Sequence, residues 1–360
     1  DRKPDRTKTR YTTQRPATMT RIAIIGAGMA GVTLAITLKD KADIVLVEKS
    51  RGLSGRISHR RADRFGFDHG AAYLTVRDHQ FTDMLAPYIS SGLLQNWPND
   101  PVMLGYGHAH AHESKASRKD SYAVKGAANE LVKSMAKDYL ADIDIRLATK
   151  VSHVFSDHSS SGRRWRIAVE QGSDERDNPD IVADWVISTA PAPQTAGIIP
   201  PSASFHQQLS EVKMQGCFTL MLGFDNKLDT GWDAAWGSHD QPIGFIADNS
   251  TKPGRDHTSS ALTIHAGNHW SSDHLTNDQD MVKEQMIDAL YARTGIDAST
   301  AAHIGFHRWL YANPLQSLQE AFVMDASSQL AGAGDWCLGG RIENAFLSAL
   351  ALGRVIRPLL

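Results

Sequence analysis

The stretch that decides the fold reads Arg21-Ile-Ala-Ile-Ile-Gly-Ala-Gly-Met-Ala-Gly31, and Ile44-Val-Leu-Val-Glu48 follows it. The four apolar residues 22–25 predict a buried parallel strand. The three glycines that follow have the G-x-G-x-x-G spacing. The first permits a tight turn, the second lets backbone approach a pyrophosphate, and the third lets the next helix pack closely on the strand. This pattern predicts a dinucleotide-binding unit.

The residues after the glycines support the same prediction. A helix over residues 29–39 would direct its free N–H groups and its positive dipole end at the phosphates. Residues 44–47 predict a second strand, and Glu48 at its carboxyl end can accept both hydroxyls of an adenosine ribose. Because strand, helix, strand and Glu48 are all in register, dinucleotide binding explains the pattern better than a glycine-rich core helix.

Composition excludes several other classes of function. The 360 residues suggest two domains or one large one. A net charge of −2 gives no basic field for nucleic acid or for an acidic membrane surface. Cys217 and Cys337 make neither a disulfide framework nor a zinc site, so a cytoplasmic location is the simplest expectation. No apolar tract is long enough to span a bilayer. We therefore expect a soluble protein without nucleic-acid or membrane partners.

Two polar segments do not belong to the dinucleotide-binding pattern. Residues 1–18 are rich in Arg, Lys and Thr and too polar to fold, so we expect a disordered leader. His108, His110 and His112 alternate, which on a strand would place them on one face with plausible metal spacing. No Cys, and no carboxylate apart from Glu113, completes that set. An exposed hairpin with incidental histidines is therefore the favoured interpretation, and no metal site is predicted.

Two motifs after the first strand pair carry a family resemblance. Lys49-Ser-Arg-Gly-Leu-Ser-Gly-Arg56 suggests guanidinium clamps on phosphate, with a solvated basic loop as the alternative. With Phe67-Asp-His-Gly-Ala-Ala-Tyr-Leu-Thr-Val-Arg-Asp78, it resembles the flavin-containing amine oxidases and their relatives, especially the short bacterial renalases. The resemblance implies that backbone around residues 70 and 71 lies beside the flavin ring. Ser54 departs from the family, in which this position is usually glycine.

The closing motif, Gly332-Ala-Gly-Asp-Trp-Cys-Leu-Gly-Gly-Arg-Ile-Glu-Asn-Ala-Phe-Leu-Ser-Ala349, resembles the family's second flavin-binding element. A Gly-Gly turn leads into a helix whose N-terminus would face the flavin N1 and C2 carbonyl, where negative charge gathers on reduction. Most relatives have glycine where this chain has Asn344. The resemblance implies noncovalent FAD, because a thioether would need a cysteine near residue 305.

The resemblance covers residues 21–357 and implies an α/β fold. A Rossmann-like FAD-binding domain of the glutathione-reductase type would be joined to a second, β-rich substrate domain, both discontinuous. We assign residues 19–78, 121–200 and 311–360 to the FAD-binding domain. Residues 79–120, which begin with a helix, and residues 201–310 are assigned to the substrate domain.

The motifs and the resemblance together nominate two sets of site residues. The expected FAD contacts are Gly26, Gly28, Met29, Gly31, Glu48, Arg51, Gly55, Arg56, Gly70, Ala71, Val151, Asp335, Glu343, Asn344 and Ala345. The expected catalytic residues are His265, Arg341, Tyr73 and Trp309. His265 would either bind substrate or satisfy a backbone carbonyl. Arg341 would either add positive potential for an anionic substrate or pair with Glu343 or the FAD pyrophosphate.

Three functions fit these expectations. The first is a renalase-type oxidase, which passes a hydride from 2- or 6-dihydro isomers of NAD(P)H to FAD, with O2 as electron acceptor and NAD(P)+ and H2O2 as products. The second is an amine oxidase, and the third is a flavin-binding protein without turnover. A single dinucleotide fingerprint favours a substrate that reduces the flavin directly. Where amine oxidases typically have a Lys two residues before a Trp near flavin N5, this chain has His307, before Trp309.

Overall fold

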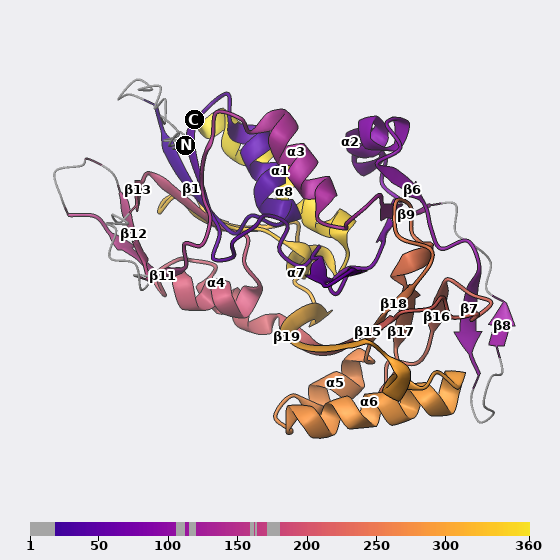
Figure 1. Cartoon of the computed structure of the whole chain (residues 1–360). Helices are drawn as coiled ribbons and strands as arrows, with labels where there is room; N and C mark the ends of the chain where they lie inside the picture. Colours follow the sequence, from indigo (N-terminus) through magenta and orange to yellow (C-terminus); the bar gives the residue numbers. More distant parts are fainter. Residues whose placement is uncertain (1–18, 106–111, 115–119, 159–161, 163, 171–180) are drawn as a thin grey trace, which may run out of the picture.

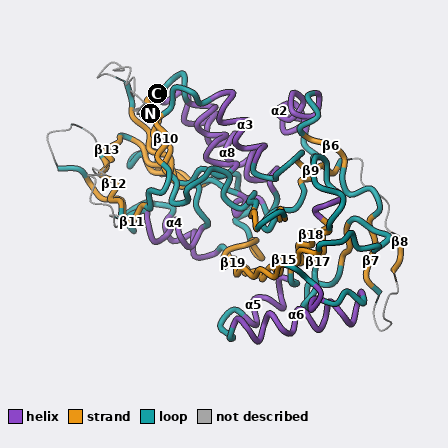
Figure 2. The backbone as a smooth tube through the Cα atoms, in the orientation of Figure 1, coloured by secondary structure: helices purple, strands orange, loops and turns teal. Residues whose placement is uncertain are grey.

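The computed structural model describes residues 19–105, 112–114, 120–158, 162, 164–170 and 181–360. The predicted leader, His108, His110 and the side chain of His112 lie outside the described part. Figure 1 shows two parts, each built on a sheet with helices packed on it, and loops fill the region between them in Figure 2. Within the described residues, no helix is both long enough and apolar enough to cross a lipid bilayer.

A six-stranded sheet forms the first part and confirms the predicted α/β class. Its strands are β1 (Arg21–Ile25), β2 (Asp43–Val47), β10 (Asp144–Arg146), β14 (Trp185–Ser188), β20 (Val323–Asp325) and β21 (Leu330–Gly332), in the order β10-β2-β1-β14-β21-β20. All neighbours pair in parallel except β20 with β21. One face is covered by α1 (Met29–Leu38), α3 (Glu130–Tyr139) and α8 (Ile342–Ile356) (Figure 1).

The opposite face of this sheet is covered as well. It packs on β11 (Val151–Ser156), β12 (Trp165–Val169), β13 (Ile181–Ala183), α4 (Ala192–Ile198), η1 (His206–Glu211) and α7 (Asp335–Leu338). Along β1, Ile22 and Ile24 enter the helix-side core, whereas Ala23 and Ile25 enter the core on this side. A strand buried on both faces has to be apolar throughout, which is why β1 reads as an unbroken apolar run.

A seven-stranded sheet forms the second part. Its strands are β7 (Pro101–Leu104), β8 (His112–Ser114), β15 (Lys213–Phe224), β16 (Ala234–Trp236), β17 (Phe245–Asp248), β18 (Ser260–His265) and β19 (His303–Gln316), in the order β19-β15-β18-β17-β16-β7-β8. It packs on α5 (Asn268–His274) and α6 (Gln279–Thr294) (Figure 1). The sequence did not predict β19, which runs past the expected domain boundary at residue 310. The boundaries themselves stay a prediction.

The first helix of the expected substrate segment, α2 (His79–Ser90), packs with the first part instead. Its buried residues Phe81 and Leu85 join the core of α1, α3 and α8, and the Phe81 ring lies 5.1 Å from that of Phe346. The remaining elements are short: β3 (Arg60–Ala62), β4 (Phe65–Phe67), β5 (Leu74–Thr75), β6 (Leu94–Asn96), β9 (Ser121–Val124), η2 (Asn249–Thr251), η3 (Ala298–Thr300) and η4 (Arg357–Leu359).

The turn after β1 shows why its glycines are needed, and a nearby serine carries a strained backbone. Gly26 has φ +102°, and a Cβ at Gly31 would lie 1.9 Å from the Gly26 carbonyl oxygen. Ser54, beside this turn, also has φ +102° and donates its N–H to Ala27 O at 2.9 Å. A non-glycine residue in this region costs about 1–3 kcal/mol. The position where the family has glycine therefore keeps the glycine conformation here.

Ser54→Gly should accordingly stabilise the protein. Strain relief should outweigh the entropy that glycine adds to the unfolded chain, about 0.4–1 kcal/mol, and leave a gain of about 1 kcal/mol. The denaturation midpoint in urea measures this. Ser50→Gly, at a nearby position without a positive φ, is the matched control and should lower the midpoint. A lower midpoint for both variants would show that Ser54 is not strained.

Candidate active site

A cavity of about 1430 Å³ lies between the two parts. It begins at the carboxyl ends of β1 and β2, where Ile25 and Glu48 line it, and extends to Phe245 on β17, His265 on β18 and Trp309 on β19. Open α/β sheets bind ligands at the carboxyl ends of their strands. We therefore divide the cavity into a dinucleotide end, next to β1 and β2, and a far end, next to β17 to β19.

The dinucleotide end has the features that a pyrophosphate and a ribose require. The first hydrogen bond within α1 runs from Val32 N to Gly28 O, so the N–H groups of residues 29–31 have no acceptor inside the helix. A Cβ at Gly55 would lie 3.4 Å from Gly28 Cα, so two bare backbones meet at the cavity wall. The buried Glu48 carboxylate accepts from Ala27 N at 2.9 Å and Ser50 N at 2.8 Å and keeps lone pairs for hydroxyl groups. These residues fit FAD.

The two arginines of the 49–56 loop have different surroundings. Arg56 lines the cavity and forms a bidentate ion pair with Asp335, with N–O distances of 2.9 and 2.5 Å, and it also donates to Ala312 O at 2.7 Å. Its charge is therefore shared with a carboxylate from the closing motif. Arg51 is exposed and does not line the cavity, so the structure does not place it among the residues that could hold a phosphate there. At Arg51 the geometry matches the solvated-loop alternative.

The N-terminus of α8 faces the cavity, where Arg341, Ile342 and Ala345 line it. Glu343 and Asn344 do not line the cavity. Their side chains bind backbone groups outside the helix and so hold its N-terminus in place. The buried Glu343 carboxylate accepts from Arg77 N at 2.6 Å and Asp78 N at 2.7 Å. The Asn344 side chain donates to Leu338 O at 3.0 Å and Gly339 O at 2.8 Å. Asn344 lies within the helix without a positive φ, so it needs no glycine-like backbone.

Arg341 lies at the edge of the cavity and is already paired. Its Nη2 lies 2.8 Å from Glu343 Oε2 and donates to Asn344 Oδ1 at 3.1 Å. The pairing with Glu343 that the sequence left open is thus formed, and the buried carboxylate offsets much of the guanidinium charge.

The backbone carbonyl of His69 joins three strands of the second part to the segment expected beside the flavin. It accepts from Trp309 Nε1 at 3.1 Å, His265 Nε2 at 3.2 Å and Thr219 Oγ1 at 3.4 Å. A carbonyl only accepts, so His265 carries its proton on Nε2. His265 therefore satisfies a backbone carbonyl and lines the cavity at the same time.

Three histidines at this end of the cavity, His69, His265 and His307, are neutral at physiological pH. Burial lowers the pKa of His69 to about 3, with Arg60 and neighbouring histidines adding to the effect. Burial also lowers the pKa of His265 to about 4, against the opposing hydrogen bond to His69. The pKa of His307 is lowered by burial and then by Arg60. The far end thus offers uncharged imidazoles.

Three aromatic side chains form a wall beside these histidines. The Tyr73 ring lies 6.1 Å from Trp236 and 5.7 Å from Phe245, and the last two are 4.9 Å apart. Tyr73 was expected from the sequence, but Trp236 and Phe245 were not. The pairing of Phe245 with both Trp236 and His265 brings them to the site, and no local pattern marks them.

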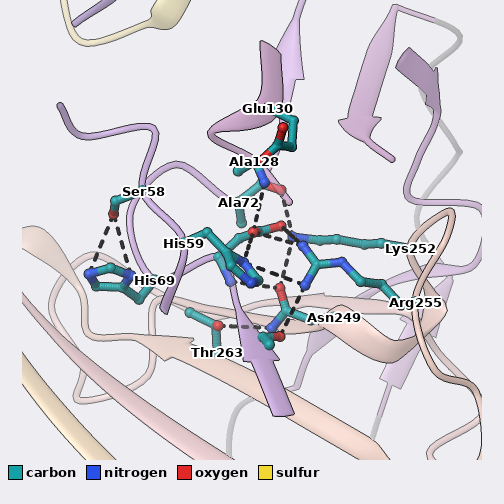
Figure 3. A network of polar contacts seen from close by, with 12 residues as sticks. Ser58, His59, His69, Ala72, Ala128, Glu130, Asn249, Lys252, Arg255 and Thr263 are labelled. Carbon is teal, nitrogen blue, oxygen red and sulfur yellow. Dashed lines mark hydrogen bonds and ion pairs between the residues drawn. The ribbon is translucent and has the colours of Figure 1, made fainter. Parts of the chain in front are cut away.

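A buried charge network, which the sequence did not predict, contacts the segment that is expected beside the flavin. Figure 3 shows His59, Lys252 and Arg255 converging around one point. At that point the Asp68 carboxylate accepts from His59 Nδ1 at 2.8 Å, Arg255 Nη2 at 2.8 Å, Lys252 Nζ at 2.9 Å and Ala128 N at 3.0 Å. Burial by itself would raise the pKa of Asp68, but Lys252, His59 and Arg255 outweigh it and hold the pKa below its usual range.

Lys252 is fully buried and acts as an ammonium group. Its Nζ donates to Asp68 Oδ2, to Ala72 O at 2.7 Å and to Asn249 Oδ1 at 3.0 Å. Three acceptors require three N–H groups, which only the protonated amine has. Through Ala72 O the network reaches the segment that lines the cavity.

The expected site residues fall into two groups, those that line the cavity and those that do not. The expected site residues that line the cavity are Gly26, Gly28, Met29, Glu48, Gly55, Arg56, Gly70, Ala71, Tyr73, Val151, His265, Trp309, Asp335, Arg341 and Ala345. Gly31, Arg51, Glu343 and Asn344 do not line it. Gly31 instead allows α1 to approach the turn, as the third glycine of the spacing predicts.

Comparison with known proteins supports the fold. Residues 24–88 match the family model of the NAD(P)-binding Rossmann-like domain. Three solved structures have similar folds over nearly their whole length. A candidate protoporphyrinogen oxidase from Exiguobacterium sp. 255-15 has a TM-score of 0.75 at 13% identity, covering 95% of this chain and 99% of that one. Putrescine oxidase bound to putrescine has a TM-score of 0.69 at 11% identity, covering 94% of this chain and 98% of that one.

Cyclohexylamine oxidase from Brevibacterium oxydans IH-35A has a TM-score of 0.68 at 14% identity, covering 95% of this chain and 99% of that one. The chain therefore has the Rossmann-like α/β fold that these oxidoreductases share, two of which are named for amine substrates.

Removing the Asp68 carboxylate should destabilise the protein strongly. Asp68→Ala leaves Lys252 and Arg255 buried without their counter-ion, which typically costs about 3–5 kcal/mol. Asp40→Ala breaks the exposed pair with Arg357 and should cost much less, because solvent screens an exposed ion pair. Urea denaturation of both variants measures the difference. Equal small losses would show that the network contributes no more than a surface pair.

Stability should fall as the pH drops from about 6.5 to 4. The pKa of His265 is about 4 in the folded state and about 6.5 when unfolded, so the unfolded chain binds more protons in this window. His265→Gln, which keeps an N–H donor, should reduce this loss by roughly 2–3 kcal/mol. Urea titrations at several pH values provide the measurement. An unchanged pH dependence in the variant would contradict a His265 that is neutral in the folded state.

Proposed function

We propose that this protein is an FAD-dependent oxidase of renalase type. Its substrate would be a 2- or 6-dihydro isomer of NAD(P)H, and its products NAD(P)+ and H2O2. Bound FAD would supply the chemistry of accepting the hydride and passing electrons to O2. The protein would bind the cofactor at the dinucleotide end and place the substrate ring at the far end.

The charge of the cavity lining is the observation that carries this proposal. The described lining includes six Lys or Arg residues and three carboxylates: Lys49, Arg56, Arg77, Lys150, Arg308 and Arg341 against Glu48, Glu170 and Asp335. Glu170 pairs with Lys150 at 2.7 Å, Asp335 pairs with Arg56, and the buried Glu343 pairs with Arg341, which leaves Lys49, Arg77 and Arg308 against Glu48 in the described lining. Among the described residues, β17, β18 and β19 contribute no carboxylate to the cavity lining, so a cationic amine would meet no counter-ion from these strands. An excess of positive charge instead favours anionic dinucleotides.

Amine oxidation is the second candidate. The wall formed by Tyr73, Trp236 and Phe245 could hold a neutral amine by apolar contact, and two of the similar folds are named for amine substrates. Both candidates use the same cofactor, so the substrate panel below separates them.

The cavity also supports noncovalent FAD. Cys217 lines it, but burial raises the pKa of this thiol to about 12, so it is not a nucleophilic thiolate at neutral pH. Its single S–H has two backbone acceptors within reach, Phe218 O at 3.4 Å and Ala266 O at 3.7 Å from Sγ. Cys337 is fully buried outside the cavity.

Anaerobic mixing of the FAD-loaded protein with a substrate panel should decide between the functions. We expect 2- or 6-dihydro-NAD(P)H to bleach the flavin absorbance, because the developing pyridinium drives hydride transfer without a general base. Air should then restore the absorbance with one H2O2 per reduced flavin. Bleaching by simple primary or tertiary amines alone would favour amine oxidation. Retained flavin that no reductant bleaches would indicate a flavin-binding protein without turnover.

A further inference from the structure

One row of side chains crosses the second sheet above the cavity. In the strand register, Thr219 on β15 lies opposite both His307 on β19 and His265 on β18. Phe245 on β17 continues the row from His265, and Trp236 on β16 continues it from Phe245. Directly opposed residues share one face of a sheet. All of them except Thr219 line the cavity.

The polar members of this row differ in what their atoms already bind. Thr219 and His265 donate to the carbonyl of His69. The ring nitrogens of His307, in contrast, have no hydrogen bond to any residue in the described part of the chain. The His307 ring is held edge-on to two cavity residues, with centroids 4.4 Å from Trp309 and 5.3 Å from His69.

The surroundings of His307 suit a neutral polar group. Its ring is half-buried and uncharged at neutral pH, so one nitrogen donates and the other accepts. The Tyr73, Trp236 and Phe245 wall lies farther along the same row. Phe245, the nearest wall residue in the row, lies three strands from His307, which is about 14 Å at about 4.8 Å per strand. A planar ring placed between His307 and this wall, carrying a group that both donates and accepts, would fill the hydrogen-bonding capacity that His307 leaves open.

We propose that His307 binds the substrate directly by hydrogen-bonding its carboxamide, and so selects a carboxamide-bearing pyridine ring. This assignment rests on the proposed function, because a dihydronicotinamide carries that group. His265, by contrast, positions the His69 carbonyl rather than the substrate.

Variants of His307 test the assignment through binding as well as turnover. The probes are NAD+ and an analogue whose pyridine ring carries no carboxamide, each titrated into FAD-loaded protein and followed by the flavin spectrum. His307→Leu should weaken NAD+ binding about 3- to 10-fold, as expected for one lost hydrogen bond, and leave analogue binding within about 2-fold. His307→Gln, which keeps a donor and an acceptor, should restore most of the NAD+ affinity. The half-saturation concentration for bleaching by the dihydro isomers should change in parallel.

His303→Leu is the matched control. His303 lies on the same strand, stacked on Phe67 at 5.6 Å, and does not line the cavity, so both ligands should bind its variant as they bind wild type. Equal loss of both ligands in His307→Leu, or no loss of either, would overturn the assignment. If NAD+ binding depends on His307 but no dihydronicotinamide bleaches the flavin, the proposed oxidase function fails and the binding role stands. If the dihydro isomers bleach the flavin equally well in wild type and in His307→Leu, the oxidase function stands and the binding role of His307 fails.

Discussion

The buried carboxylate of Asp68 is the interaction on which the arrangement of this molecule depends. Asp68 follows β4, whereas Lys252 and Arg255 follow η2, more than 180 residues later in the chain. Desolvated charges are tolerated only when they are paired and hydrogen-bonded, so this network disfavours displacement of these segments relative to one another. Lys252 also donates to Ala72 O, within the segment that lines the cavity. The shape of the cavity is therefore tied to this network.

The His69 carbonyl holds the same segment by hydrogen bonds from the second sheet. Three donors from three neighbouring strands meet at one acceptor, which sets the orientation of the peptide expected beside the flavin. The same burial keeps His69 and His265 neutral. Low local polarity thus does two things: it strengthens these hydrogen bonds and removes charge from the far end of the cavity. Both effects suit positioning of a substrate more than proton transfer by these histidines.

Much of the first part could be predicted because its signals are local. The strand β1, the helix α1 and the glycine turn follow from hydrophobic periodicity and from spacings within eleven residues. The strand β19 was missed because its mixed pattern matches neither template and its pairing with β15 is non-local. The packing of α2 on α8 was also missed, since its apolar face fits either part and only the contact with Phe346 decides between them.

For the site, the sequence by itself determined which residues line the dinucleotide end of the cavity, since a glycine spacing and a terminal Glu48 specify backbone approach without distant partners. It could not decide which polar side chains remain available. Arg56 pairs with Asp335, and His265 donates to a backbone carbonyl, whereas the His307 nitrogens have no partner among the described residues. Each of these outcomes depends on where residues far away in the chain lie. A hydrogen bond or ion pair depends on the distance and direction between two groups, and for such residues only the tertiary structure sets them.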